Sequence, residues 1–204
     1  MGKKHQEGFT LIELLVLMMV LALTLGLGVP AMNGMVANNR MTVAANDLVS
    51  SIRAARAQAS TRSLPVTLCA SSDWEAEEPA CAQGASLLDG WIVFEDGDGN
   101  AARGPGETVL LAHGPIDAGI RGQARSAADG GTPQFLSFRA DGFPAEVAGR
   151  PGLRNIQLCD SRGNSDTGGG RAAGRWIMVS PAGHTALVDT VSQLQAASNP
   201  LGGC

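Results

Sequence analysis

The chain has 204 residues, enough for one globular domain with a long helix, or for two small domains at most. Its 15 lysines and arginines against 19 aspartates and glutamates give a formal net charge of −4, which excludes a global basic field for nucleic acid but not a local basic patch. Tyrosine is missing and aromatic residues make up only 4 % of the chain, which argues against a base-stacking surface.

The N-terminal part of the chain contains a long apolar run, because residues 14–39 carry no charge. About 20 apolar residues span a bilayer. An ordinary secretory signal peptide with Lys3 and Lys4 as its basic leader is the alternative, but the run is longer than such a core and no small-x-small site follows it closely. Glu13 also lies near the start of the run, and an ionised side chain costs up to about 2.5 to 3.5 kcal/mol within such a helix. A retained membrane helix is therefore predicted, with a carboxylate that needs a partner.

The stretch GFTLIEL, from Gly8 to Leu14, resembles the prepilin signature of type IV pilins and type II secretion pseudopilins. The resemblance implies that a prepilin peptidase removes residues 1–8 as a leader, cutting between Gly8 and Phe9, and methylates the new amine of Phe9. It also implies that Glu13 acts in assembly by pairing with the N-terminal amine of a neighbouring subunit. At about 4 Å and an effective dielectric constant of about 20, that attraction is roughly 4 kcal/mol.

The helix is predicted to continue past the membrane, with residues 9–37 as its transmembrane and filament-core half and residues 38–64 as an amphipathic half that packs on a head. Apolar residues in the second half recur at steps of three and four, at Met41, Ala45, Leu48, Ile52, Ala55 and Ala59. The opposite face carries Arg40, Asn46, Arg53 and Arg56. Pro30 lacks a backbone donor, so a kink or a locally unwound turn is expected between the halves.

Residues 65–204 read as a β-rich head. Short β-branched and apolar runs predict strands at 66–70, 91–95, 108–113, 135–139, 155–159, 175–180 and 185–188. The segments ADGFPAE and SPAGH predict tight turns, and residues 161–174 are expected to form a mobile glycine-rich loop. The expected fold class is α+β, pilin-like: a long N-terminal transmembrane helix followed by a β-sandwich-like globular head.

The four cysteines are even in number and lie in a part of the chain expected outside the cytoplasm, where disulfides form. Three pairings are possible. We favour Cys69–Cys81, which closes a short loop after a strand, and Cys159–Cys204, which ties down a glycine-ended tail. Zinc is the rival use, but no CxxC pair is present.

Three head segments follow one another in a recognisable order: LCAS at 68–71, GWIVFED at 90–96 and ETVLL at 107–111. This order resembles the FimT/FimU minor pilins and the related GspH pseudopilins. The resemblance implies a minor pilin, a structural subunit of a type IV pilus in its tip or initiation complex. The alternatives are the H-type pseudopilin of a type II secretion system and a DNA-binding pilin for natural transformation. The four cysteines and the GWIVF stretch favour the pilus.

The same resemblance implies the partners and the location. The partners would be other major and minor pilins or pseudopilins, the prepilin peptidase, the inner-membrane assembly platform and, before assembly, the lipid bilayer. The location would be the bacterial inner membrane with a single pass and the head in the periplasm, and then the filament.

A metal loop is one reading of the turn DGDGNAARGPGE. Asp96, Asp98, Asn100 and Glu107 fall at the first, third, fifth and twelfth positions of a calcium-loop template. Ala101, however, stands where the template needs glycine, and the flanks read as strands. A solvated hairpin turn is favoured, and no metal or other cofactor is expected.

Arg162, Arg171 and Arg175 are the candidate DNA contacts, on the expected glycine-rich loop. Some FimT proteins bind DNA through a Gly-Arg-x-Arg motif near the C-terminus. The residues at the matching turn here, Gly183 to Ala186, include neither arginine, which argues against DNA as a partner. His113 and His184 have no nearby serine elbow or carboxylate pair, so no enzyme activity is expected.

Overall fold

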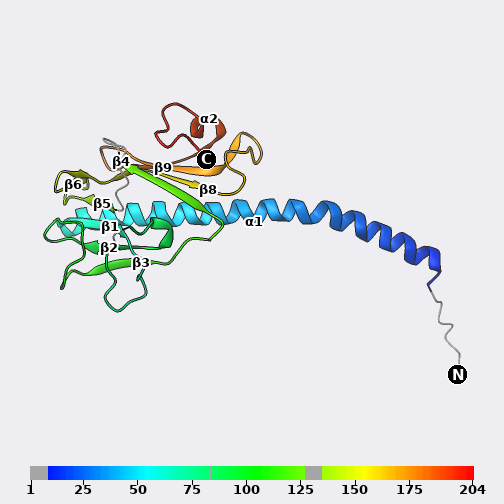
Figure 1. Ribbon diagram of the computed structural model, residues 1–204, viewed down its shortest axis with the longest axis horizontal. Coiled ribbons are helices and arrows are strands. Elements are labelled where there is room, and N and C mark those ends of the chain that lie inside the picture. The colour runs from blue at the N-terminus through cyan, green and yellow to red at the C-terminus, as the bar shows by residue number, and fades with distance from the viewer. Residues whose placement is uncertain (1–8, 83, 127–134) are drawn as a thin grey trace, which may run out of the picture. The chain divides into compact units, whose positions relative to one another are not determined.

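The computed structural model describes residues 9–82, 84–126 and 135–204. The chain divides into two compact units, residues 1–39 and residues 40–204. The long helix α1 (Leu11–Arg62) contributes its first part to the first unit and its second part to the head (Figure 1). The backbone is helical through residue 30, whereas the side chain of Pro30 lies outside the described part, so the kink expected there stays a prediction.

The head is built from two antiparallel sheets. The first has the strand order β3-β2-β1-β5-β6-β7. Its strands are β1 (Val66–Ala70), β2 (Trp91–Glu95), β3 (Val109–His113), β5 (Phe135–Phe138), β6 (Pro144–Val147) and β7 (Arg150–Pro151). The second has the order β10-β9-β8-β4, with β4 (Arg121–Ser126), β8 (Leu153–Cys159), β9 (Arg171–Val179) and β10 (Thr185–Thr190). Two short helices, η1 (Leu87–Asp89) and α2 (Val191–Leu194), complete the described elements. The α+β class and the two-sheet head agree with the prediction.

The core of the head forms where the second half of α1 meets both sheets. The six apolar residues predicted to share one helix face, Met41, Ala45, Leu48, Ile52, Ala55 and Ala59, are all fully buried. They belong to one cluster with Leu68 and Val93 of the first sheet and Leu158 and Ile177 of the second. Figure 1 shows labelled strands of the two sheets on either side of this part of α1. Burying helix and sheets in one core removes apolar surface from water and stabilises the head.

The strand predictions are correct for the apolar segments and miss the polar ones. β1 and β2 occupy the predicted residues. β4 was not predicted, because its half-buried residues are Gly122 and Ala124, too small to give an apolar alternation between Arg121, Gln123 and Arg125. β6 and β7 were missed because β6 begins at a proline and β7 has two residues.

The glycine-rich loop predicted at residues 161–174 is four residues shorter in the structure. β9 begins at Arg171, and Ala172 and Ala173 are buried within it. The two predicted tight turns are present: the N–H of Gly142 donates to Arg139 O, and the N–H of Gly183 donates to Ser180 O, both at 2.8 Å. Both glycines have φ near +77°, the left-handed region that glycine tolerates without strain.

Candidate functional site

The start of α1 combines a helix cap with the acidic residue of the N-terminal motif. The backbone N–H of Glu13 donates to Thr10 Oγ1 at 3.3 Å, and the N–H of Leu14 donates to Thr10 O at 3.2 Å. Thr10 thus satisfies one of the N–H groups that a helix start leaves free. Glu13 lies in the first turn, where the helix dipole favours a negative charge. The Thr-x-x-Glu spacing is visible in the sequence and gives Glu13 a local role besides the one expected in assembly.

The first half of α1 exposes an unbroken apolar surface. Every leucine, isoleucine, valine and methionine from Leu11 to Val29 is at least 51 % exposed, and Phe9 is 75 % exposed. The helix contains an 18-residue window of mean hydropathy 2.5 and is, by length and composition, able to cross a membrane. Thr24 Oγ1 donates to Val20 O at 3.0 Å and to Leu21 O at 2.9 Å, so its hydroxyl is satisfied within the helix. Such a surface suits lipid or other apolar helices as its surroundings.

Two disulfides are present in the head, and their pairing is the one favoured from the sequence. Cys69 of β1 bonds to Cys81, and Cys159 at the end of β8 bonds to Cys204. Near the second bridge, Asn199 is 4 % exposed, and its amide donates to Gln157 Oε1 at 2.9 Å and to Leu194 O at 2.8 Å. The C-terminal tail is therefore fixed by a buried polar network as well as by a covalent bond.

The turn between β2 and β3 exposes residues 97–100, as expected for a solvated hairpin, whereas Asp96 and Ala101 are buried. Asp96 is fully buried and accepts hydrogen bonds from Thr67 Oγ1 at 2.6 Å and from the backbone N–H groups of Asn100 and Ala101, each at 3.0 Å. Burial raises the pKa of Asp96, and these hydrogen bonds oppose the rise. The signal that sequence reasoning lacked is Thr67, which lies on β1 and is distant in the chain.

The calcium-loop residues of the same turn come together only in part. Oxygen atoms of Asp96, Asp98 and Glu107 lie within 4.8 Å of one another. Glu107, however, already accepts the N–H groups of Gly97 at 2.9 Å and Gly104 at 2.7 Å. The side chain of Asn100 donates to Asp98 at 2.7 Å. These carboxylates therefore have protein donors, and the turn holds its shape through them.

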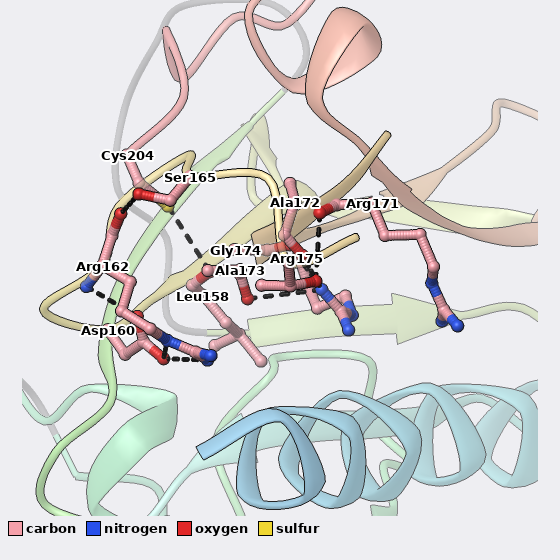
Figure 2. Close-up of polar contacts among 11 residues, drawn as sticks. Leu158, Asp160, Arg162, Ser165, Arg171, Ala172, Ala173, Gly174, Arg175 and Cys204 are labelled. Carbon is pink, nitrogen blue, oxygen red and sulfur yellow. Dashed lines mark hydrogen bonds and ion pairs between the residues drawn. The ribbon is translucent and has the colours of Figure 1, made fainter. Parts of the chain in front are cut away.

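The three candidate DNA-contacting arginines do not form a shared basic surface. Figure 2 shows Arg162 turned towards Asp160 and Arg175 turned towards the carbonyl groups of its own strand, with Arg171 extending away from both. Arg162 Nε donates to Asp160 Oδ2 at 2.9 Å, and Arg171 Nη2 lies 2.9 Å from Asp189 Oδ2.

Arg175 is predicted both to begin the strand at 175–180 and to be an exposed DNA contact, and only the strand is confirmed. It lies on β9, is only 4 % exposed, and its Nη1 donates to Gly174 O at 2.9 Å (Figure 2). Burial lowers the pKa of its guanidinium, which a nearby Asp189 partly offsets. A buried arginine that bonds to its own backbone is not available to a phosphate backbone, so the predicted cluster is reduced to two ion-paired arginines.

The comparison with known protein families covers both parts of the chain. The model described as Type II transport protein GspH matches residues 44–183, more than half of the chain. The chain belongs to the GspH family. A second model, the prokaryotic N-terminal methylation motif, matches residues 3–29 of this GspH-family chain, and that range contains Gly8, Phe9 and Glu13. The family resemblance inferred from the sequence motifs is thereby confirmed.

Two solved structures are similar to this GspH-family protein, both crystal structures of the type IV minor pilin FimU from Pseudomonas aeruginosa PAO1. The first has 18 % sequence identity, covers 74 % of this chain and 89 % of FimU, and gives a TM-score of 0.48. The second, from another crystal form, has 16 % identity, covers 72 % and 91 %, and gives a TM-score of 0.45. No curated protein matches the chain.

Family membership fixes the broad class of the protein. The GspH family comprises structural pilin and pseudopilin subunits, and the methylation motif implies contact with other pilins and with a prepilin peptidase in general. Gly8 lies outside the described residues, and Phe9 is exposed just before α1 begins.

Proposed function

We propose that this GspH-family chain is a minor pilin of a type IV pilus, inserted at low copy in the tip or initiation complex. The single observation that carries the proposal is the exposed apolar half of α1, which begins at the methylation motif and continues into a GspH head. Because this surface suits apolar surroundings, the subunit would be held in the inner membrane first, with the head in the periplasm, and among other pilin helices after assembly.

Processing follows from the same motif. A prepilin peptidase would cut between Gly8 and Phe9, remove residues 1–8 and methylate the amine of Phe9. The new amine would then stand two residues before Leu11, where α1 begins. Glu13 would pair with the corresponding amine of a neighbouring subunit on the assembly platform.

Intact-mass measurement of the protein purified from membranes tests the processing step. The expected mass corresponds to residues 9–204 with both disulfides and one methyl group added. Gly8→Leu should leave the full-length precursor, because the peptidase must fit the backbone at that position. A mature protein that begins beyond residue 30 would contradict the proposal, because the apolar helix would then be a removed signal sequence.

A pair of variants separates the assembly role of Glu13 from its role in the helix start. Glu13→Gln removes the charge but keeps a side chain that suits the third position of a capping box. Thr10→Ala removes the cap and keeps the charge. We expect both to be processed, Glu13→Gln to be absent from sheared filaments, and Thr10→Ala to be present. Normal filament entry of Glu13→Gln would show that the amine pairing is not needed.

The second candidate function is an H-type pseudopilin of a type II secretion system, favoured by the description of the matching family, Type II transport protein GspH. The two candidates differ in what a gene deletion abolishes. Loss of surface pili with intact protein secretion supports the pilus, and the reverse supports the secretion system. The third candidate, a DNA-binding pilin, receives no support from Arg162, Arg171 and Arg175, for the structural reasons given above.

A further inference from the structure

We propose that the head binds a phosphate- or sulfate-like oxyanion in a hollow between α1 and the turn that joins β9 to β10. The hollow has a volume of about 460 Å³, and its basic side chains are Arg53, Arg56 and His184. All three belong to the head unit, residues 40–204. The site is separate from the helix start and the apolar surface, so it does not depend on which filament the subunit enters.

Arg56 is fixed in place by two turns that are distant in sequence. Its Nε donates to Gly142 O at 3.0 Å, and its Nη1 lies 3.3 Å from His184 Nδ1. A Cβ added at Gly183 would lie 2.6 Å from Gly142 O and 3.0 Å from Arg56 Nε, so glycine is required there for the turns to close on the guanidinium. One turn of helix earlier, Arg53 Nη2 donates to Thr185 O at 3.4 Å.

The contact between Arg56 and His184 determines what the histidine can offer a ligand. A guanidinium group can only donate hydrogen bonds, so His184 Nδ1 must accept. With Nδ1 accepting, the proton of the ring lies on Nε2, which makes that atom a donor. Among the described residues, Arg56 uses Nε and Nη1 in these contacts, and its Nη2 makes no hydrogen bond, so Nη2 can donate to a ligand. The hollow thus presents several N–H donors from two elements.

The charges of this hollow are not balanced by carboxylates. Within the described residues, six other arginines each form an ion pair with an aspartate or glutamate: Arg40, Arg62, Arg103, Arg139, Arg162 and Arg171. Arg53 and Arg56 have no such partner there, and neither do five further described arginines. What sets Arg53 and Arg56 apart is that they lie three residues apart on one helix, where like charges repel.

The acidic and basic groups around the hollow leave it positive. Asp141, next to Gly142, is engaged by Arg139 at 2.9 Å and by the N–H of Phe143 at 3.0 Å. Arg154 Nη1 donates to Ser180 O at 3.0 Å, at the other end of the β9–β10 turn, and the charge of Glu146 lies near Arg154, so the positive charge of the hollow comes from Arg53 and Arg56. A basic hollow in a chain of net charge −4 is a local feature that an anion would neutralise.

A tetrahedral oxyanion suits this arrangement of donors. Arginine presents its N–H groups in a planar fork that matches phosphate oxygens, and hydrogen bonds to charged groups are the stronger ones. Phosphate can accept from both guanidinium groups and from the imidazole N–H at once, whereas a carboxylate has only two oxygens. One such group is also too little for tight duplex DNA binding, which needs several phosphates neutralised together.

The test uses the full-length chain in a neutral detergent with ring-¹⁵N histidine and inorganic phosphate as the probe. Phosphate is added at fixed ionic strength and at a fixed pH above its second pKa. We expect the Nε2 resonance of His184 to move and saturate. His113 provides an internal control, because its ring is stacked on Trp91 and its Nδ1 contacts Gly114 O, away from the hollow.

Variants then assign the effect to the arginines. Arg53→Gln should weaken phosphate binding by about tenfold or more, since it removes charged donors. Arg125→Gln is the matched control, because Arg125 also donates to a carbonyl group, that of Pro200, but lies on β4. Arg56→Lys keeps the charge but loses the fork, so it should bind phosphate more weakly than the parent. Circular dichroism checks that each variant is folded.

Four results would overturn the proposal. The first is the absence of a saturable His184 shift. The second is an equal shift on adding sodium chloride or acetate. The third is unchanged affinity in folded Arg53→Gln. The fourth is micromolar binding of duplex DNA that is lost in Arg53→Gln while phosphate alone does not bind, because that would assign the hollow to a polymer and not to a single oxyanion.

Discussion

Removal of the Cys159–Cys204 disulfide should destabilise the head more than removal of Cys69–Cys81. The reason is the length of chain that each bridge closes, which is 45 residues for the first and 12 for the second. In the chain-entropy model, these separations correspond to about 4 and about 3 kcal/mol of unfolding free energy. For a chain of this size, they correspond to melting-temperature decreases of roughly 8 to 16 °C and 6 to 12 °C.

The surroundings of the two bridges also favour a larger loss of stability when Cys159–Cys204 is removed. Cys81 lies in a loop already tied by backbone, since the N–H of Ala82 donates to Ala70 O at 2.9 Å. Cys204 ends the chain, and a Cβ at Gly174 would lie 2.6 Å from its Sγ, so β9 has no side chain at the point where the bridge packs. Without this bridge, the tail is held by non-covalent contacts: the buried side chain of Leu201, the hydrogen bonds of Asn199, and the bond from the N–H of Cys204 to Asn164 Oδ1 at 3.0 Å.

Denaturant unfolding of the full-length protein in neutral detergent measures the two effects. Cys69→Ala/Cys81→Ala and Cys159→Ala/Cys204→Ala are compared with the parent, and each single-bridge protein is repeated with a reductant as its control. Two results would refute the reasoning. One is a larger loss from the 69–81 pair. The other is a non-reduced peptide map that contains free thiols or a Cys81–Cys159 link.

The remaining predictions concern acid and DNA. Burial alone would raise the pKa of Asp160, but hydrogen bonds from Arg162 outweigh burial and lower that pKa. The Asp160–Arg162 pair therefore stabilises the head at pH values above the pKa of Asp160 in the unfolded chain. This stabilisation is lost as the pH falls through the lower pKa of Asp160 in the folded protein. Asp160→Asn should therefore reduce stability at neutral pH and flatten the acid loss below about pH 4 in denaturant titrations. The full-length protein should bind duplex DNA no tighter than about 10⁻⁴ M near physiological salt. Micromolar, salt-sensitive gel shifts lost in Arg162→Gln/Arg171→Gln would contradict this.

The sequence predicts most of the fold where apolar periodicity is strong. The helix face through Leu48 and Ile52 is buried as predicted, and β1 and β2 have their predicted bounds. These segments are specified by local patterns, which a single sequence displays directly. β4 is held by pairing with β8 across a long stretch of chain, with Gln123 opposite Gln157, so its polar residues give no local signal.

The environment of charged side chains is the part that the sequence does not predict. Arg175 and Asp96 both stand beside glycines in turn-like segments, and both were expected to be exposed. The structure buries them because strands from elsewhere in the chain supply neighbours: Asp96 meets Thr67 of β1, and Arg175 lies on β9 between β8 and β10. Burial depends on such long-range contacts, whereas composition around a residue reports only its chain neighbours.

The apolar half of α1 has few polar side chains, and their hydrogen bonds indicate which of these side chains can favour transfer of the helix from lipid into a filament. Between Glu13 and Met32, the polar side chains are those of Glu13 and Thr24. The Thr24 hydroxyl bonds to carbonyl groups of its own helix, so it is satisfied equally in lipid and among helices. The Glu13 carboxylate has no ion-pair partner among the described residues. In the proposed filament, its pairing with an amine is worth roughly 4 kcal/mol, whereas apolar side chains exchange one apolar environment for another. If the proposed pairing forms, we therefore expect Glu13 to contribute more than Thr24 to the preference of this half of α1 for the filament.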